Sequence, residues 1–304
     1  MRKPAPLRKN DIIAIVAPSG YIDLNKTIDC AQTLSNWGYK VWVDTNTVGY
    51  DTGNYFAGTD EIRTRSLQNA LDNPDVKAIL CARGGYGMSR IIDRLNFKQF
   101  NKHPKWIIGY SDITLLHLHL QQKLKTASLH APMAAAFMPT EDQSYLMYIQ
   151  QALKGNLSNY KFAPTPYNNY GKVEGELLGG NLALLTHSIG SQSEPNVKNK
   201  ILFIEDVGEY FYTIDRMLWQ LKRAGWFNKI SALLVGDFSS TKDTIRPFGK
   251  SLEELVLEVV PKDLPIAFNI PIGHQAANIA IKCGAKHSLN INKAAVRLKE
   301  LKQE

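Results

Sequence analysis

Short, continuously apolar segments alternate with segments of helical periodicity through the first half of the chain. Continuous apolar runs are typical of strands that are buried on both faces of a parallel sheet. Strands separated by helices at this spacing indicate right-handed βαβ units and an open parallel sheet, an α/β architecture of the flavodoxin or Rossmann type. The expected strands are residues 11–17, 41–43, 78–81 and 106–108, with a further short strand at 127–129.

Turn and capping residues mark the helices of this half. An apolar stripe over residues 28–37 predicts a helix, and Gly38 follows it in the position that favours a left-handed backbone. Thr59 stands where a second helix would need a capping side chain. Residues 140–143 have the pattern of a capping box, which predicts another helix that runs to about Lys154.

The second half of the chain has a different pattern of apolar segments. A segment rich in Pro and Asn, residues 162–172, predicts a linker between a first domain, 1–161, and a second domain, 173–304. The spacing of apolar runs beyond the linker indicates a mixed α+β domain. We expect strands at 173–180, 201–206 and 232–236, helices from Asn181, at 212–224 and at 252–260, and short strands around Ala267, Ile279, Leu289 and Val296.

A serine lies at the point where the strand 106–108 turns into a helix. Gly109 ends the strand, and Ser111 and Asp112 begin a helical pattern. Strand, tight turn, serine and helix is the arrangement of a nucleophile elbow, in which free helix N–H groups lie beside the hydroxyl. The second glycine of that motif is replaced by Ile113. The alternative is that Ser111 only caps the helix, which serine often does.

The strand 78–81 leads into a glycine-rich loop, residues 83–87. The loop lacks the Lys-Ser/Thr of a phosphate-binding Walker loop, and Arg90 occupies the place of the third glycine of a dinucleotide motif. Its glycines would let backbone N–H groups approach an anion, which suits half of an oxyanion hole as well as a simple turn. Both this loop and Ser111 follow the carboxyl ends of strands, where open parallel sheets form their binding crevice.

A histidine and a group of carboxylates in the second half could complete a catalytic site. His274 stands in a rigid Pro-Ile-Gly-His loop with Asn278 close behind, a setting that favours an exposed, oriented imidazole. Glu205, Asp206 and Glu209 follow a buried strand, where one carboxylate could orient the imidazole. We expect Glu205 to do so, because it is the first polar residue at the carboxyl edge. The ordinary alternatives are a structural histidine and acidic residues at a helix N-terminus.

Composition removes several other classes of function. The 304-residue chain carries a formal net charge of +8, but its basic residues are dispersed and lack a nucleic-acid-binding signature. Cys30, Cys81 and Cys283 are widely spaced, and no histidines or acids have metal-ligand spacing, so neither a disulfide framework nor a metal site is expected. The polar N-terminus and the lack of a long apolar run indicate a cytoplasmic protein without membrane spans.

Taken in order along the chain, the motifs resemble those of the LD-carboxypeptidase family of muramoyltetrapeptide carboxypeptidases. The resemblance implies a triad of Ser111 as nucleophile, His274 as base and Glu205 as orienting acid, with backbone N–H groups of Gly85 and Asp112 as the oxyanion hole. It also implies a homodimer, no cofactor, and a site that lies between two domains. Lys282 departs from the family pattern without an obvious catalytic meaning. The motifs are residues 16–20, 83–87, 109–112, 179–181, 205–209 and 271–274.

The reaction that the resemblance implies is hydrolysis of the amide between the L-centre of a diamino acid and the terminal D-alanine of murein tetrapeptides. A related alternative is a self-immunity hydrolase that cleaves toxic aminoacyl-nucleotide compounds of the microcin C type. An alternative from another class is a catalytically inactive ligand-binding protein on the same scaffold, although all three triad positions are filled. A nucleotide-cofactor enzyme is disfavoured by the incomplete glycine motif.

Overall fold

The structure is a computed structural model that describes residues 1–137 and 144–302. The chain divides into two compact units. The first contains residues 1–156 together with 279–282, and the second contains residues 157–278 together with 283–304. The helix expected after the capping box at 140–143 is present as α6 (Leu146–Leu153), but the capping box itself lies outside the described residues.

The first unit is built on a sheet whose order, in the described residues, is β11-β5-β4-β3-β1-β2. The pairs β1–β2, β1–β3, β3–β4 and β4–β5 are all parallel, as the apolar runs predicted. Every residue of β4 and β5 is buried, and for β4 this burial explains the uninterrupted apolar run of residues 106–108. The strands are β1 (Ile12–Val16), β2 (Lys40–Val43), β3 (Val76–Cys81), β4 (Trp106–Gly109), β5 (Ser128–His130) and β11 (Ile281–Cys283).

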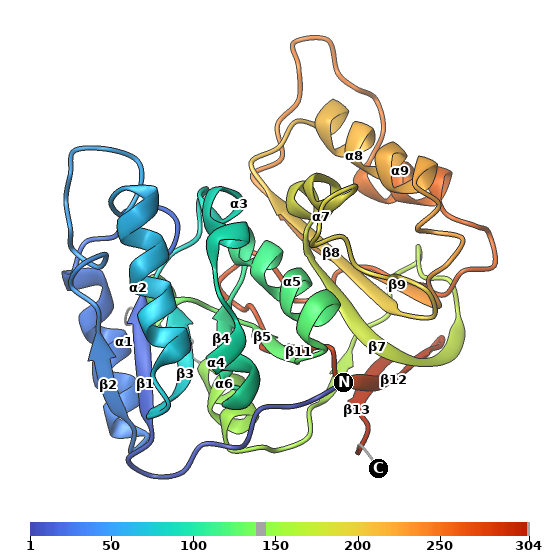
Figure 1. Ribbon diagram of the computed structural model, residues 1–304. Coiled ribbons are helices and arrows are strands. Elements are labelled where there is room, and N and C mark those ends of the chain that lie inside the picture. The colour runs from blue at the N-terminus through green and yellow to red at the C-terminus, as the bar shows by residue number, and fades with distance from the viewer. Residues whose placement is uncertain (138–143, 303–304) are drawn as a thin grey trace. The chain divides into compact units, whose positions relative to one another are not determined.

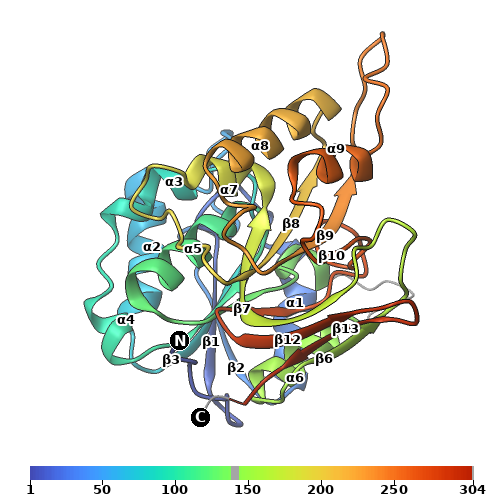
Figure 2. The same cartoon turned by 90° about the vertical axis from the view of Figure 1, so that its right-hand side faces the viewer.

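Helices cover both faces of this sheet, which confirms the α/β architecture (Figure 1). Figure 2 shows α2, α4 and α5 on one side of the strands and α1 and α6 on the other. The core on the α1 side joins alternate residues of the strands, such as Ile13, Ile15 and Leu80, to Leu34 of α1 and Ile149 of α6. The helices are α1 (Asn25–Asn36), α2 (Asp60–Asp72), α3 (Met88–Ile91), α4 (Lys98–Lys102), α5 (Thr114–Leu124) and α6, with 3-10 turns η1 (Ile92–Arg94), η2 (Ser111–Ile113) and η3 (Ala134–Phe137).

The second unit has a mixed sheet, with the order β10-β9-β8-β7-β12-β13-β6 in the described residues. The pairs from β10 to β7 are parallel, and the pairs from β7 to β6 are antiparallel, which matches the mixed α+β expectation. The strands are β6 (Asn159–Phe162), β7 (Gly171–Asn181), β8 (Ile201–Val207), β9 (Ala232–Ser239), β10 (Ile266–Ala267), β12 (Lys286–Ile291) and β13 (Val296–Glu300). The helices are α7 (Leu182–Ser188), α8 (Phe211–Arg223) and α9 (Leu252–Val259).

The boundary between the units differs from the expected linker in two respects. The expected linker, 162–172, begins in β6 and ends in β7, and both of these strands belong to the second unit. The strand β6 was not expected; it forms because its backbone pairs with β13, a partner more than a hundred residues away. The first unit is also discontinuous, because residues 279–282 return to it and supply β11 beside β5.

Lys282, in the returning segment, has a hydrogen-bond partner in the first continuous part of this unit. Its side chain is buried, and Nζ donates a hydrogen bond of 2.6 Å to the carbonyl of Asn156. A buried ammonium group is costly unless it is hydrogen-bonded. The contact therefore anchors the returning segment to the last residue of the first continuous part of this unit.

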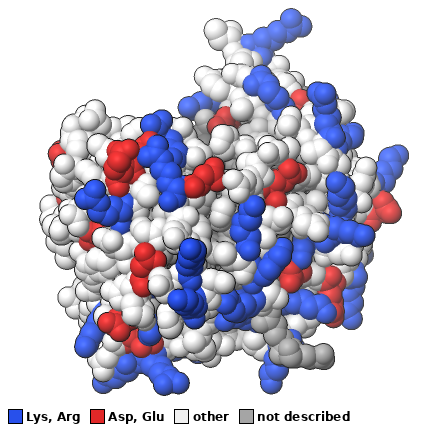
Figure 3. All heavy atoms as spheres, in the orientation of Figure 1, with Lys and Arg blue, Asp and Glu red and all other residues white. Residues whose placement is uncertain are grey.

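The surface carries both signs of charge. On the face drawn in Figure 3, Lys and Arg side chains are interspersed with Asp and Glu. None of the helices in the described residues has the length and apolar character that a membrane crossing requires.

The cap at the start of α2 gives a test of the local sequence signals. Thr59 was expected to cap this helix, and its hydroxyl accepts a hydrogen bond of 3.3 Å from the N–H of Ile62. We predict that Thr59→Ala lowers the free energy of unfolding by about 1 kcal/mol, because the helix loses a capping acceptor. Urea denaturation followed by circular dichroism measures this change. Thr52→Ala, in an exposed loop, is the control and should change the value by less than about 0.5 kcal/mol. Equal effects of the two substitutions would contradict the capping role.

Candidate active site

Ser111 occupies a strained turn at the carboxyl end of β4. Its backbone φ is +62°, in the left-handed region, while Tyr110 before it is extended. A non-glycine residue in that region costs about 1–2 kcal/mol, so the surrounding structure must impose the conformation. Ser111 is the first residue of η2, and Tyr110 holds the N-cap position. Ser111 therefore does not take the capping position that the alternative interpretation assigned to it.

The glycine-rich loop after β3 passes directly against Ser111. A Cβ placed on Gly84 would lie 3.0 Å from the Cβ of Ser111 and 3.1 Å from its Oγ. Only glycine lets the loop backbone come this close without displacing the serine. The structure thus brings Ser111 and the loop that contains Gly85 together within the first unit, at the carboxyl ends of neighbouring strands.

The side chain of Asp112 connects this serine turn to two loops. Its carboxylate is buried, and Oδ2 accepts hydrogen bonds from the hydroxyl of Ser19 at 2.6 Å and from the N–H of Met88 at 2.8 Å. Ser19 lies in the loop after β1, and Met88 follows the glycine-rich loop. Three strand ends are therefore linked through one carboxylate.

His117 supports the same turn from α5. Its buried Nε2 lies 2.8 Å from the carbonyl oxygen of Gly109, the last residue of β4. Burial lowers the pKa of His117 to about 4, despite the opposing effect of this hydrogen bond, so the neutral ring donates to the carbonyl. The sequence pattern did not reveal this contact.

His274 and Glu205 form a hydrogen-bonded pair in the second unit. Nδ1 of His274 lies 2.8 Å from Oε2 of Glu205. Glu205, at the carboxyl end of β8, is completely buried, whereas the side chain of His274 keeps 18% of its surface exposed. A carboxylate that accepts from Nδ1–H fixes the tautomer and the orientation of the imidazole ring.

Close backbone packing makes this pair possible. A Cβ on Gly273 would lie 3.2 Å from the Cβ of Glu205 and 2.9 Å from that of Asp237. The N–H of Gly273 donates to Oδ1 of Asn278 at 3.2 Å, so the residue behind the histidine loop holds its backbone. Asp237 was not expected from the sequence, although its place in β9, the parallel neighbour of β8, was a usable signal.

The other two carboxylates of this region face different partners. Asp206 is buried and accepts hydrogen bonds from Nδ2 of Asn181 at 2.8 Å and from the N–H of Ala183 at 3.0 Å, at the start of α7. Glu209 lies beyond β8, and its backbone carbonyl accepts from the N–H of Lys242. Of the three acids weighed in the sequence, the structure brings Glu205 to His274.

The charges around His274 raise the pKa of its imidazole above the ordinary value. Burial is the largest influence and lowers that pKa, but the hydrogen bond to Glu205 and the charges of Glu205, Asp206 and Asp237 together outweigh it. Burial also raises the pKa of Glu205, and the hydrogen bond to His274 opposes this. The pair therefore holds its proton at the imidazole more firmly than an isolated histidine would.

Over residues 1–137 and 144–302, no group of three or more His, Cys, Asp or Glu side chains is arranged to hold a metal ion.

We predict that NMR titration of the His274 ring gives a pKa above 6.5, and that Glu205→Gln lowers it. The sign follows from charge, because the neutral amide no longer favours the imidazolium while burial still opposes it. Glu209→Gln is the matched control and should leave the midpoint within about 0.3 unit, since Glu209 is not among the charges that shift His274. A Glu205→Gln midpoint equal to or above that of the native protein would contradict this assignment.

Comparisons with known proteins identify a family that matches both halves of the chain. The family model described as the LD-carboxypeptidase N-terminal domain matches residues 13–131, and that described as the LD-carboxypeptidase C-terminal domain matches residues 174–289. A probable murein peptide carboxypeptidase of Bacillus subtilis is 34% identical, over 95% of this chain and 91% of its own length.

A solved structure and a second relative extend the comparison. The crystal structure of muramoyltetrapeptide carboxypeptidase from Oxalobacter formigenes has a TM-score of 0.87 and 29% identity, covering 96% of this chain and 99% of that one. The Microcin C7 self-immunity protein MccF of Escherichia coli is 26% identical, over 97% of this chain and 95% of its own length. Because the family's models match most of both halves and a relative above 30% identity aligns along nearly the whole length, the chain belongs to the LD-carboxypeptidase family.

Proposed function

We propose that this protein is a serine-type LD-carboxypeptidase that releases the terminal D-alanine from murein tetrapeptides. The bond it cleaves joins the L-centre of a diamino acid to that D-alanine. The observation that carries the proposal is the 2.8 Å contact between Nδ1 of His274 and the fully buried carboxylate of Glu205. Buried pairing of this kind is what a general base needs, and the relatives named for murein peptides supply the substrate class.

In the proposed reaction Ser111 is the nucleophile. Its Oγ attacks the carbonyl carbon of the scissile amide while Nε2 of His274 takes the hydroxyl proton. The negative charge that forms on the carbonyl oxygen would be stabilised by the backbone N–H groups of Gly85 and Asp112. Collapse of this intermediate breaks the C–N bond, and the imidazolium returns the proton to the leaving amino group of D-alanine.

Water completes the cycle. It attacks the acyl-enzyme ester with His274 again acting as the base, and Ser111 leaves as the restored hydroxyl. The strained backbone of Ser111 supports this role, because nucleophile elbows hold the serine in such a turn so that its hydroxyl projects from the strand end. We further propose that the enzyme works as a homodimer in the cytoplasm, as the family resemblance implies.

The self-immunity reaction is the second candidate, because the MccF protein is 26% identical over nearly the whole chain. The same three residues could hydrolyse an acyl-linked nucleotide, so the chemistry alone does not separate the two. Parallel assays on a murein tetrapeptide and on an aminoacyl sulfamoyl nucleoside would do so. The proposal requires D-alanine release, detected by mass spectrometry, with a higher kcat/KM than cleavage of the nucleoside.

We predict that Ser111→Ala lowers kcat for D-alanine release by a factor on the order of 10⁴ to 10⁶, because no other group replaces the attacking oxygen. Mass spectrometry of D-alanine gives the rate, and circular dichroism establishes that the variant is folded. Ser144→Ala, at an exposed serine of the same unit, is the control and should keep the native rate. Turnover of Ser111→Ala within about tenfold of the native enzyme would remove this serine from the mechanism.

Two isosteric substitutions distinguish the acidic partner of the base. Glu205→Gln keeps the shape of the side chain but removes the charge that stabilises the imidazolium, so kcat should fall by a factor on the order of 10³ to 10⁴. Glu209→Gln should cost much less, because this carboxylate is not the one bonded to His274. Steady-state kinetics of both variants on one tetrapeptide give the comparison. A larger loss at Glu209 would show that the wrong carboxylate has been assigned.

A further inference from the structure

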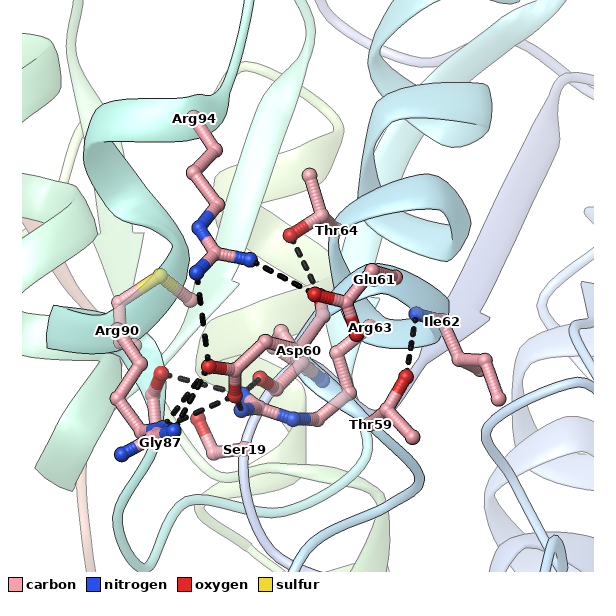
Figure 4. A network of polar contacts seen from close by, with 12 residues as sticks. Ser19, Thr59, Asp60, Glu61, Ile62, Arg63, Thr64, Gly87, Arg90 and Arg94 are labelled. Carbon is pink, nitrogen blue, oxygen red and sulfur yellow. Dashed lines mark hydrogen bonds and ion pairs between the residues drawn. The ribbon is translucent and has the colours of Figure 1, made fainter.

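Arg63 is a completely buried arginine that the proposed reaction does not use. It lies in the first turn of α2 and its side chain has no exposed surface. Removing a guanidinium from water costs several kcal/mol unless the group is paired and hydrogen-bonded, so its partners explain its place in the fold. Figure 4 shows Arg63 with its partners Asp60 and Gly87, and its third partner is the carbonyl of Pro18, so the partners come from three segments of the first unit.

The guanidinium ties together the loops that follow β1 and β3. Nη1 donates to the carbonyl of Pro18 at 2.6 Å and to the carbonyl of Gly87 at 3.0 Å. Nη2 pairs with the carboxylate of Asp60, one helical turn back, and Asp60 also pairs with Arg90 at 2.9 Å. The cation is thus held by its own helix and reaches both loops with a single nitrogen.

The backbone conformation of Gly87 and its lack of a side chain allow this contact. Its φ is +146°, and a Cβ built there would lie 2.6 Å from Nη1 of Arg63. Any side chain at this position would displace the guanidinium from the carbonyl that it binds. The last glycine of the glycine-rich loop therefore serves a contact with Arg63, in addition to any role in anion binding.

Arg63 and Asp112 hold the same peptide group from its two ends. The carbonyl of the Gly87–Met88 peptide accepts from Arg63, and the N–H of that peptide donates to Oδ2 of Asp112 at 2.8 Å. The same two residues hold the loop after β1, where the carbonyl of Pro18 accepts from Arg63 and the side-chain hydroxyl of Ser19 donates to Asp112 at 2.6 Å. The guanidinium of Arg63 donates hydrogen bonds and the carboxylate of Asp112 accepts them, and together they fix both loops.

We propose that Arg63 is a positioning residue that sets the distance between the two N–H groups of the oxyanion hole. The inference rests on the proposed function, in which those groups belong to Gly85 and Asp112. Gly85 lies two residues before the Gly87–Met88 peptide group that Arg63 and Asp112 hold, and Asp112 is itself one of these two residues. Without the guanidinium, the Gly87 carbonyl loses its buried side-chain donor, and the peptide group that Asp112 holds at its N–H is no longer held at its carbonyl by Arg63. Arg63 does not touch the substrate; it acts through the loop backbone.

The test compares Arg63→Met, which keeps the apolar length of the side chain, with Arg63→Lys, which keeps one cationic donor. Loss of one oxyanion-hole donor lowers kcat by a factor on the order of 10² to 10³, so Arg63→Met should lower kcat by about 10² or more. KM for the tetrapeptide should stay within about threefold, because the affected groups act on the transition state. Arg63→Lys should recover about tenfold of the lost kcat and should stay at least about tenfold below the native value, because an ammonium cannot reproduce the fork of donors of a guanidinium. The matched control is Arg94→Met, at the half-exposed end of the same network, with kcat within about threefold of native.

A second measurement separates positioning from a general loss of structure. In the Ser111→Ala background, adding the Arg63→Met substitution should leave the Kd for the intact tetrapeptide unchanged, since ground-state binding is unaffected. A peptidyl boronic acid, which forms a tetrahedral adduct with the serine, should bind native enzyme at least tenfold more tightly than Arg63→Met. Should Arg63→Met not fold, Arg63→Lys carries the test, with an expected tenfold or greater loss of kcat at unchanged KM.

Defined results would overturn the inference. A folded Arg63→Met enzyme with native kcat, or a variant that changes only KM or the Kd of the intact peptide, would show that Arg63 has no part in positioning the oxyanion hole. An Arg63→Lys variant with native kcat would do the same if Arg63→Met does not fold. Failure of the proposed function is a different result, because it would appear as full turnover by Ser111→Ala whatever stands at position 63.

Discussion

Buried charge is the constraint on which the functional regions of both units depend. Arg63 and Asp112 in the first unit, and Glu205 and Asp206 in the second, are all buried. An ion withdrawn from water costs several kcal/mol unless neighbouring groups hydrogen-bond to it. Those neighbours include groups of loops at strand ends, such as the carbonyls of Pro18 and Gly87 and the imidazole of His274. The hydrogen bonds that the buried ions require therefore help to hold these loops in place.

Different residues hold the backbone and carry the partly exposed imidazole. His117 supports the end of β4 with a neutral ring, while Asp112 joins the serine turn to the loops after β1 and β3. His274 has a buried acid on one ring nitrogen and keeps part of its surface exposed. The side chains of His117 and Asp112, which hold the backbone, are buried, whereas the imidazole to which the proposal assigns proton transfer keeps part of its surface exposed. A preorganised site needs both kinds, because donors that move during reaction stabilise charge less effectively.

The sequence predicted most of what depends on local pattern and little of what depends on distant pairing. The apolar runs predicted the strands β1, β3, β4 and β8. The choice of Glu205 as the partner of His274 rested on its position at the end of a predicted strand. The burial of Arg63 could not be predicted from the sequence, because a charged residue on an amphipathic helix normally faces water. Its burial depends on Pro18 and Gly87, which lie 45 and 24 residues away. The strand β6 was missed for the same reason, since β13 alone makes it a strand.

The return of residues 279–282 to the first sheet has a consequence for how this chain can be made and divided. The strand β11 lies beside β5 at the edge of that sheet, so a fragment ending at residue 156 leaves the backbone of β5 unpaired on one side. During synthesis the first sheet stays one strand short until nearly the whole chain has left the ribosome. No single cut separates the two units, and the serine-bearing half reaches its complete form only after the histidine loop has been translated.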